Sequence, residues 1–112
     1  MTEREKKFLS DIFKSILLIE QFTIDVASFA AFEKDTRTRA AVERHLGIIG
    51  EAVNKFLKES GNNEINHAHQ IISMRNRIIH AYDDIDDSII WSIVTRHLPL
   101  LKKEIDGKLG GD

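Results

Sequence analysis

One short segment of the chain carries the side chains best suited to chemistry. It reads Arg75-Asn76-Arg77-Ile78-Ile79-His80-Ala81-Tyr82. The guanidinium of an arginine is always charged, and its planar fork matches the oxygens of a phosphate. A histidine titrates near neutral pH, so His80 is the natural group for proton transfer. Asn76 stands one helical turn before His80 and can orient it, while Tyr82 can either hydrogen-bond a ligand or pack.

Arg75 has an unusual position if this segment is a helix. At about 100° per residue it falls inside the apolar stripe that contains Ile71 and Ile78. A guanidinium in such a stripe needs an anionic or hydrogen-bonding partner. One interpretation is a structural ion pair with Glu51, which helix geometry alone favours, and the other is a phosphate ligand. Arg75 and His80 point about 140° apart on an ideal helix. Either the helix distorts near its end, or two copies of the helix build the site between them.

Composition and motifs exclude several other kinds of site. The 112 residues include no cysteine, which rules out disulfides, thiolate zinc sites and a cysteine nucleophile. His67 and His69 point to different sides of a helix and make a poor metal pair. No HExxH, P-loop or GxGxxG motif occurs. We therefore expect no metal and no other cofactor.

The charge pattern limits how the chain can meet nucleic acid. Its formal net charge is −2, whereas a protein that coats nucleic acid through charge alone should be basic. An RNA contact would therefore be local, or would need a partner. Basic side chains gather at Arg37, Arg39, Arg44 and His45, which we interpret as a solvated helix face, and again at Arg75 and Arg77. An acidic run follows at Asp83, Asp84, Asp86 and Asp87.

The start of the chain gives no targeting signal. The segment MTEREKKFLSDIFKSILLIE has no apolar core before its first charges. No apolar run approaches the ~20 residues that span a bilayer. Together with the absence of cysteine, these features predict a cytoplasmic protein with no membrane contact.

The elements that must position the segment are helices, because apolar residues recur at spacings of three and four. We expect a broadly buried first helix, with Phe13 and Leu17 widening its apolar stripe, that weakens near Thr23. A short helix should cover 28–32. The next should begin at the N-cap Asp35 and end at 59–63. A further helix should run from about 66 or 67 to about 82. A last one should start at Asp86 or Asp87, with Pro99 kinking or dividing it.

These helices predict one all-α domain over residues 1–108, a four- to five-helix up-and-down bundle, with 109–112 as a disordered tail. Gly47 and Gly50 lower the helix propensity of their segment, so we expect a neighbouring helix to approach closely there. The first and last helices have wide apolar surfaces, and Trp91 lies off the main stripe of its helix. These features predict a homodimer.

The segment from Arg75 to Tyr82 resembles the motif of the HEPN superfamily, in which a histidine follows an arginine by four to six residues. Its extension to a tyrosine looks like the HepT toxins. Three other stretches are similar to that family, namely Ala41-Val42-Glu43-Arg44-His45-Leu46-Gly47-Ile48-Ile49-Gly50-Glu51-Ala52, Ile85-Asp86 and His97-Leu98-Pro99-Leu100-Leu101. The resemblance covers nearly the whole chain, although His45 and Gly47 are less usual within the central helix.

The resemblance implies a dimeric helical bundle that places two copies of the motif in one cleft, and a metal-independent RNase. His80 would act as base or acid when the ribose 2′-hydroxyl attacks the adjacent phosphate. Arg75 would stabilise charge on the phosphoryl oxygens, and Asn76 would position His80 or the phosphate. Glu51 and Arg77 would give structural support. The resemblance also implies an MntA-type antitoxin, a nucleotidyltransferase that transfers AMP to Tyr82.

Three functions stay open at this point. The first is a toxin RNase, silenced by complex formation and by AMPylation of Tyr82. The second is a non-catalytic subunit that binds a nucleotide or a nucleotidyltransferase partner, which the acidic net charge favours slightly. The third is a helical dimer of purely structural role, with Arg75 paired to Glu51.

Overall fold

A computed structural model describes residues 1–61, 64–80 and 86–110, with the backbone alone at 78–80. Every regular element in this part is helical, which confirms the all-α class. The helices are α1 (Glu3–Thr23), α2 (Phe29–Lys34), α3 (Thr36–Ser60), α4 (His69–His80), α5 (Asp87–Ser92) and α6 (Leu98–Gly110). A π-helical segment, η2 (Ile93–His97), joins α5 to α6.

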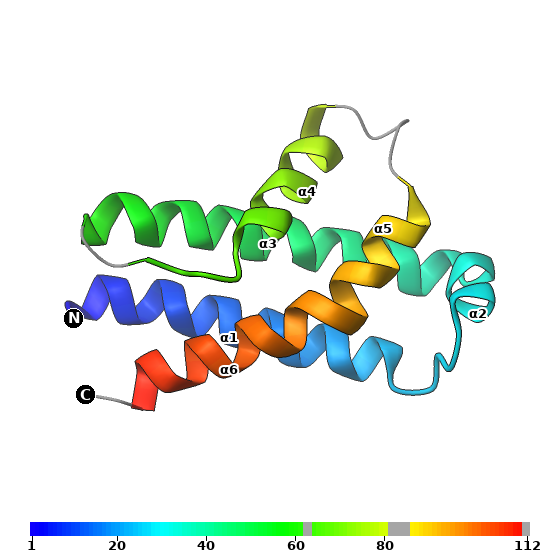
Figure 1. The fold of residues 1–112 in the computed structure, drawn as a ribbon, viewed down its shortest axis with the longest axis horizontal. Coiled ribbons are helices and arrows are strands. Elements are labelled where there is room, and N and C mark those ends of the chain that lie inside the picture. Colours follow the sequence, from blue (N-terminus) through cyan, green and yellow to red (C-terminus); the bar gives the residue numbers. More distant parts are fainter. Residues whose placement is uncertain (62–63, 81–85, 111–112) are drawn as a thin grey trace.

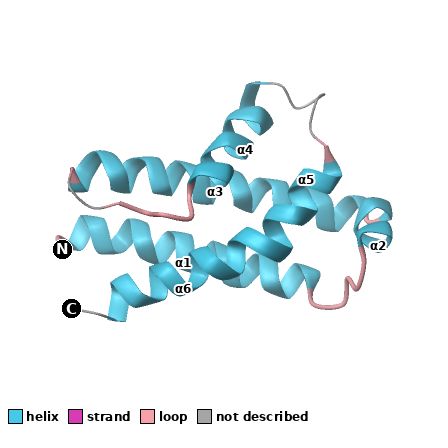
Figure 2. Ribbon diagram, in the orientation of Figure 1, coloured by secondary structure: helices cyan, strands magenta, loops and turns pink. Residues whose placement is uncertain are grey.

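The long helices α1 and α3 lie side by side, and α6 packs against α1 (Figure 1). Helix α4 packs on α3 but stands steeply to it, while α5, η2 and α6 form one continuous rod (Figures 1 and 2). The expected bundle is therefore confirmed. The steep crossing of α4 holds the segment around Arg75 against the middle of α3.

Local capping signals set most helix ends. The Asp35 carboxylate accepts a hydrogen bond from the Thr38 backbone N–H at 3.0 Å, as expected for the N-cap of α3. Gly61 ends that helix with φ +67°, a left-handed conformation that suits glycine. Asp86 caps α5 by accepting from the Ser88 N–H at 2.8 Å. The short helix α2 begins after Ser28, near the range predicted for it.

Helix α4 begins later than the sequence predicts, at His69 rather than near 66. The Glu104 carboxylate of α6 accepts hydrogen bonds from the backbone N–H groups of Asn66 and His67, at 2.6 and 3.0 Å. These N–H groups are satisfied by a side chain distant in sequence, so the backbone before His69 is held in a turn.

The rod at the end of the chain changes its hydrogen-bond pattern just before Pro99, where the sequence predicts a kink or a division. Proline has no N–H, and its ring clashes with the carbonyl four residues earlier in a regular helix. The structure widens the preceding turn instead of breaking it, because the Leu98 N–H donates to the Ile93 carbonyl, five residues back.

The core lies between α1, α3, α4 and the rod. Its fully buried larger side chains are Phe32, Phe56, Leu9, Ile12, Ile16, Ile19, Leu46, Ile49, Ile71, Met74, Ile90 and Leu101. Leu17, expected to widen the buried stripe of α1, is instead 37% exposed. Trp91 is half-buried and packs on the core, with its ring centroid 5.1 Å from that of Phe32.

The last helix reaches further than expected, since residues 109 and 110 of the predicted tail belong to α6. Within the described ranges, no helix has the length and apolar character that crossing a bilayer requires.

Candidate functional site

Arg75 lies where α4 touches the backbone of α3. The contact falls on Gly50, as the low helix propensity there predicts. A Cβ atom built on Gly50 would lie 2.5 Å from the Cβ and 2.9 Å from the Cγ of Arg75. Such distances are impossible for real atoms, so the close approach requires glycine. Gly47 has open space around it instead, and the close approach expected there is not found.

The polar end of Arg75 has few partners. Its Nε atom is buried and makes no hydrogen bond within the described part of the chain. Its Nη1 donates to the Asn76 Oδ1 at 3.3 Å. A buried N–H without a partner is unfavourable, so this guanidinium is poised to accept an anion. A phosphate would offer several acceptor oxygens to such a fork.

The alternative ion pair with Glu51 is not found among the described residues. Glu51 pairs with Lys55 on its own helix, at 3.3 Å between Nζ and Oε1. It borders a shallow groove between α1 and α3, together with Lys7 and Asp11. Glu51, the neighbour of Gly50 on α3, therefore pairs within its own helix, and no carboxylate of the described residues forms an ion pair with Arg75.

The rest of the motif is only partly described. Asn76 is exposed beside Arg75. His80 is the last residue of α4, and its side chain lies outside the described part of the chain, as does all of Tyr82. Helix α4 is regular from His69 to His80, so positions 75 and 80 lie on different sides of it. The helix distortion considered above is not found.

Arg77 points away from Arg75 and borders a groove between α4 and the rod formed by α5 and η2. Its charge reaches the start of α5. Hydrogen bonds from the hydroxyl and the backbone N–H of Ser88 lower the pKa of Asp86, and Arg77 contributes a smaller effect in the same direction.

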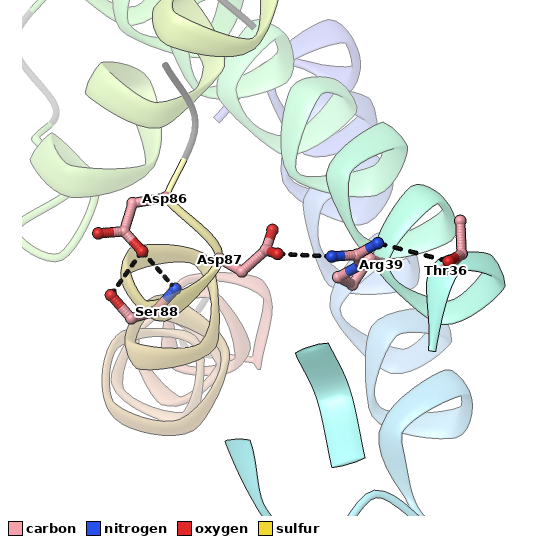
Figure 3. Close-up of polar contacts among 5 residues, drawn as sticks. All are labelled: Thr36, Arg39, Asp86, Asp87 and Ser88. Carbon is pink, nitrogen blue, oxygen red and sulfur yellow. Dashed lines mark hydrogen bonds and ion pairs between the residues drawn. The ribbon is translucent and has the colours of Figure 1, made fainter. Parts of the chain in front are cut away.

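The first basic cluster is only half solvated. Arg37 and Arg44 are exposed, as expected, but Arg39 links two helices. Its Nη1 contacts the Asp87 Oδ2 at 2.6 Å, and its Nη2 donates to the Thr36 hydroxyl at 3.4 Å (Figure 3). This ion pair fastens α5 to the start of α3, and so fixes the element that follows the motif.

His45 is the other departure from the predicted solvated face. Its Nδ1 lies 3.4 Å from the Ser15 hydroxyl, and its ring packs against Phe22 at 5.5 Å between centroids. Burial, and to a lesser degree the charge of Arg44, lowers the pKa of His45. This histidine therefore joins α1 to α3 in its neutral form.

Within the described ranges, no three His, Asp or Glu side chains gather closely enough to hold a metal ion.

Known proteins place this arrangement in context. "Probable ribonuclease HepT" of Thermococcus cleftensis is 34% identical over 112 residues, covering 95% of this chain and 96% of that protein. A protein of Methanocaldococcus jannaschii named as an RNase candidate is 36% identical over 110 residues, covering 95% and 98%. A second from that organism is 38% identical over 106 residues, covering 90% and 84%. No solved structure matches the chain significantly.

The relatives agree with a match to a whole protein family. The family described as "Ribonuclease HepT-like" matches residues 12–107, which include all of α3, α4, α5 and η2. Because the family model matches residues 12–107 and two of these relatives each cover 95% of the chain, this chain belongs to the HepT-like family.

Proposed function

We propose that this protein is a ribonuclease that cleaves RNA without a metal ion. The observation that carries the proposal is the guanidinium of Arg75, which lies on Gly50 beside Asn76 and lacks a carboxylate partner among the described residues. The ribonuclease names of the relatives support the same substrate. An RNA substrate and the absence of cysteine both suit a cytoplasmic protein.

The proposed reaction is attack of a ribose 2′-hydroxyl on the adjacent phosphorus. A base removes the hydroxyl proton as the O2′–P bond forms, and the P–O5′ bond breaks as an acid gives a proton to the leaving oxygen. The products are a 2′,3′-cyclic phosphate and a 5′-hydroxyl. Arg75 stabilises the charge that builds up on the phosphoryl oxygens, and Asn76 positions the phosphate or His80.

The proposed active unit is a homodimer. One chain supplies one motif histidine, whereas the reaction needs both a base and an acid. Positions 75 and 80 also face different sides of a regular helix. Two copies of α4 in one cleft would bring together two His80 side chains and place the Arg75 of one copy near the His80 of the other.

We further propose that the protein is the toxin of a type VII toxin–antitoxin pair, neutralised by an MntA-type nucleotidyltransferase. The support is its HepT-like family membership and the position of Tyr82, two residues after His80. Transfer of AMP to the Tyr82 hydroxyl releases pyrophosphate from ATP and leaves a charged phosphodiester on the tyrosine. That charge and bulk would oppose entry of an RNA phosphate.

The test is cleavage of single-stranded and structured RNA in EDTA by the purified protein, His80→Ala and Arg75→Ala. We expect both variants to lose at least about a hundredfold in rate, as for removal of a group that acts in the transition state. His67→Ala and the exposed Arg37→Ala are matched controls and should keep full activity. Equal cleavage by all five proteins would contradict the proposal. No cleavage by the wild type would favour the non-catalytic subunit that binds a nucleotide or nucleotidyltransferase.

Tyr82→Phe separates regulation from chemistry. We expect this variant to cleave RNA normally but to resist the antitoxin, because it lacks the hydroxyl that accepts AMP. Mass spectrometry after incubation with the antitoxin and ATP measures the modification directly. Loss of cleavage by a well-folded Tyr82→Phe protein would instead give Tyr82 a catalytic role.

A further inference from the structure

A groove of about 390 Å³ lies between α4 and the rod formed by α5 and η2. This volume is within the range of about 300–1,000 Å³ that is typical of small-molecule sites. Among the described residues, ten line the groove, namely His69, Gln70, Ser73, Met74, Arg77, Ser88, Ile89, Ser92, Ile93 and His97. We name it the α4–α5 groove.

One wall of the α4–α5 groove is a single face of α4. His69, Ser73 and Arg77 are spaced four residues apart, so they stack along the helix in successive turns. All three are exposed. The wall therefore presents an imidazole, a hydroxyl and a guanidinium in line, directly beside Asn76 of the motif.

The opposite wall depends on the π-helical turn. Ser88 and Ser92 lie one α-helical turn apart, and His97 follows Ser92 by five residues. Residues five apart would point about 140° from each other on an α-helix. In η2 the hydrogen bonds close five-residue turns, so His97 shares the face of Ser92. The π turn thus aims this imidazole into the groove.

The two walls run in opposite directions. Arg77, late in α4, influences the pKa of Asp86 at the start of α5, and α4 also contacts η2. Arg77 therefore stands at the same end of the groove as Ser88, while His69 stands at the end of His97. The Asp86 carboxylate at the Arg77 end is already occupied by the Ser88 hydroxyl, which donates to it at 2.7 Å.

Charge and polarity indicate what the groove would bind. None of the ten described residues that line it is acidic, although the chain has 18 acidic residues against 16 basic ones. Met74 and Ile93 are buried and form an apolar floor with Ile89. A cation at one end, hydroxyls along both walls and an apolar floor suit a ligand with a phosphate, a sugar and a flat base.

We propose that the α4–α5 groove binds one unpaired nucleotide of the RNA substrate, on a different side of α4 from the phosphate that meets Arg75. Arg77 contacts the phosphate of the bound nucleotide. Its base lies over Met74, Ile89 and Ile93, and the imidazole of His97 contacts its other end. The inference rests on the proposed function for its substrate, and makes the enzyme selective for single-stranded RNA.

Binding is tested apart from cleavage, with a short fluorescent single-stranded RNA and protein carrying His80→Ala. Ser73→Trp fills the groove from an exposed position, and we expect it to weaken binding at least about tenfold, as for loss of one stacked base. Arg77→Ala should weaken binding and lower the salt dependence by about 0.7 in log–log slope, as for one lost phosphate contact. Ala30→Trp on α2 and Arg96→Ala, both exposed outside the groove, are matched controls.

Unchanged binding by Ser73→Trp and Arg77→Ala, or equal losses in the controls, would overturn the inference. His97→Ala on the opposite wall gives an independent measurement if Ser73→Trp folds poorly. Its binding should weaken without loss of the melting transition. If the wild type cleaves RNA and the groove variants bind RNA as well as the wild type, only the proposal for the groove is contradicted. If the groove variants weaken RNA binding but the wild type does not cleave RNA, only the proposal of ribonuclease activity is contradicted.

Discussion

At the scale of single residues, the position of Arg75 depends on the absence of a side chain at Gly50 of the facing helix α3. Burial of the arginine follows from its place in the apolar stripe of α4, which is visible in the sequence. The sequence does not show which residue of α3 meets the arginine, because Glu51 and Gly50 are neighbours that face different directions on that helix. Which of them meets α4 depends on how the two helices cross, and that is a property of the tertiary structure.

Gly50→Ala should therefore impair catalysis through Arg75. The new methyl group would overlap the Cβ and Cγ atoms of Arg75 and displace the side chain. We therefore expect a fall in kcat of at least about tenfold with a smaller change in KM. Gly47→Ala is the control, because it adds a methyl group in open space. It should keep full activity and gain up to about 1 kcal/mol in stability from helix propensity.

A merely structural effect of Gly50→Ala can be recognised in the background of Arg75→Ala. If Gly50 acts through Arg75, the double variant should cleave no more slowly than Arg75→Ala alone. Additive losses in rate would show that Gly50 supports the fold rather than the arginine.

His45 should make stability depend on pH. Its pKa is lowered in the folded protein, so the unfolded chain binds the proton more readily. The free energy of unfolding should therefore fall as the pH drops below the ordinary value of 6.5. Urea unfolding of His45→Gln at about pH 7.5 and about pH 5.5 should show a smaller difference than the wild type. An unchanged difference, or the same reduction in the control His67→Gln, would contradict this role.

At the scale of helices, the sequence predicts those ends that are set locally. Asp35, Gly61 and Asp86 act within a few residues of where they stand, and each was predictable from its own neighbourhood. The start of α4 was not, because Glu104 reaches the backbone of Asn66 and His67 from a different helix. The spacing of His69, Ser73 and Arg77 puts them on one face of α4, but the groove also needs the π turn that presents His97.

The ion pair between Arg39 and Asp87 should contribute to stability through the packing of α5 on α3. Both side chains are about one-quarter exposed, at 25% and 24%. Asp87→Ala would leave the arginine without its carboxylate, and we expect a loss of about 1–3 kcal/mol in the free energy of unfolding.

A double-mutant cycle with Arg39→Ala isolates the pair from the effect of Asp87 on the N-terminus of α5. The more exposed pair of Lys7 and Asp11 within α1 is the control, with an expected coupling of about 0.3–0.5 kcal/mol. A coupling no larger for Arg39 and Asp87 would mean that apolar contacts alone hold α5 in place.

At the scale of the molecule, the thin shape leaves several large apolar side chains exposed to solvent. The chain measures 42 × 29 × 19 Å, so it is thin in one direction and has little depth for a core. Leu17, Leu18, Phe22 and Leu100 are between 37% and 46% exposed, and Ile24 is 80% exposed. The sequence predicts such surfaces on the first and last helices, and all five of these residues lie on or next to α1 or on α6.

We expect sedimentation velocity at micromolar concentration to give the mass of a dimer, twice 12.8 kDa. Burial of these apolar side chains would supply the driving force. Leu18→Glu should weaken association and lower RNase activity together, while Ala30→Glu, at an exposed position on α2, should change neither. A stable wild-type monomer would remove both the dimer and the site shared between its copies.

The π turn in the rod has a consequence for how sequences of this kind can change. The buried residues of the rod are Ile90, Ile93, Leu98, Leu101 and Ile105, at spacings of three, five, three and four. Deletion of Val94 would make the second spacing four, which is the repeat of an unbroken α-helix. The turn therefore behaves as a one-residue insertion that the core tolerates. Without it, Pro99 would meet the carbonyl four residues earlier, so loss of the insertion should be unfavourable for as long as the proline is kept.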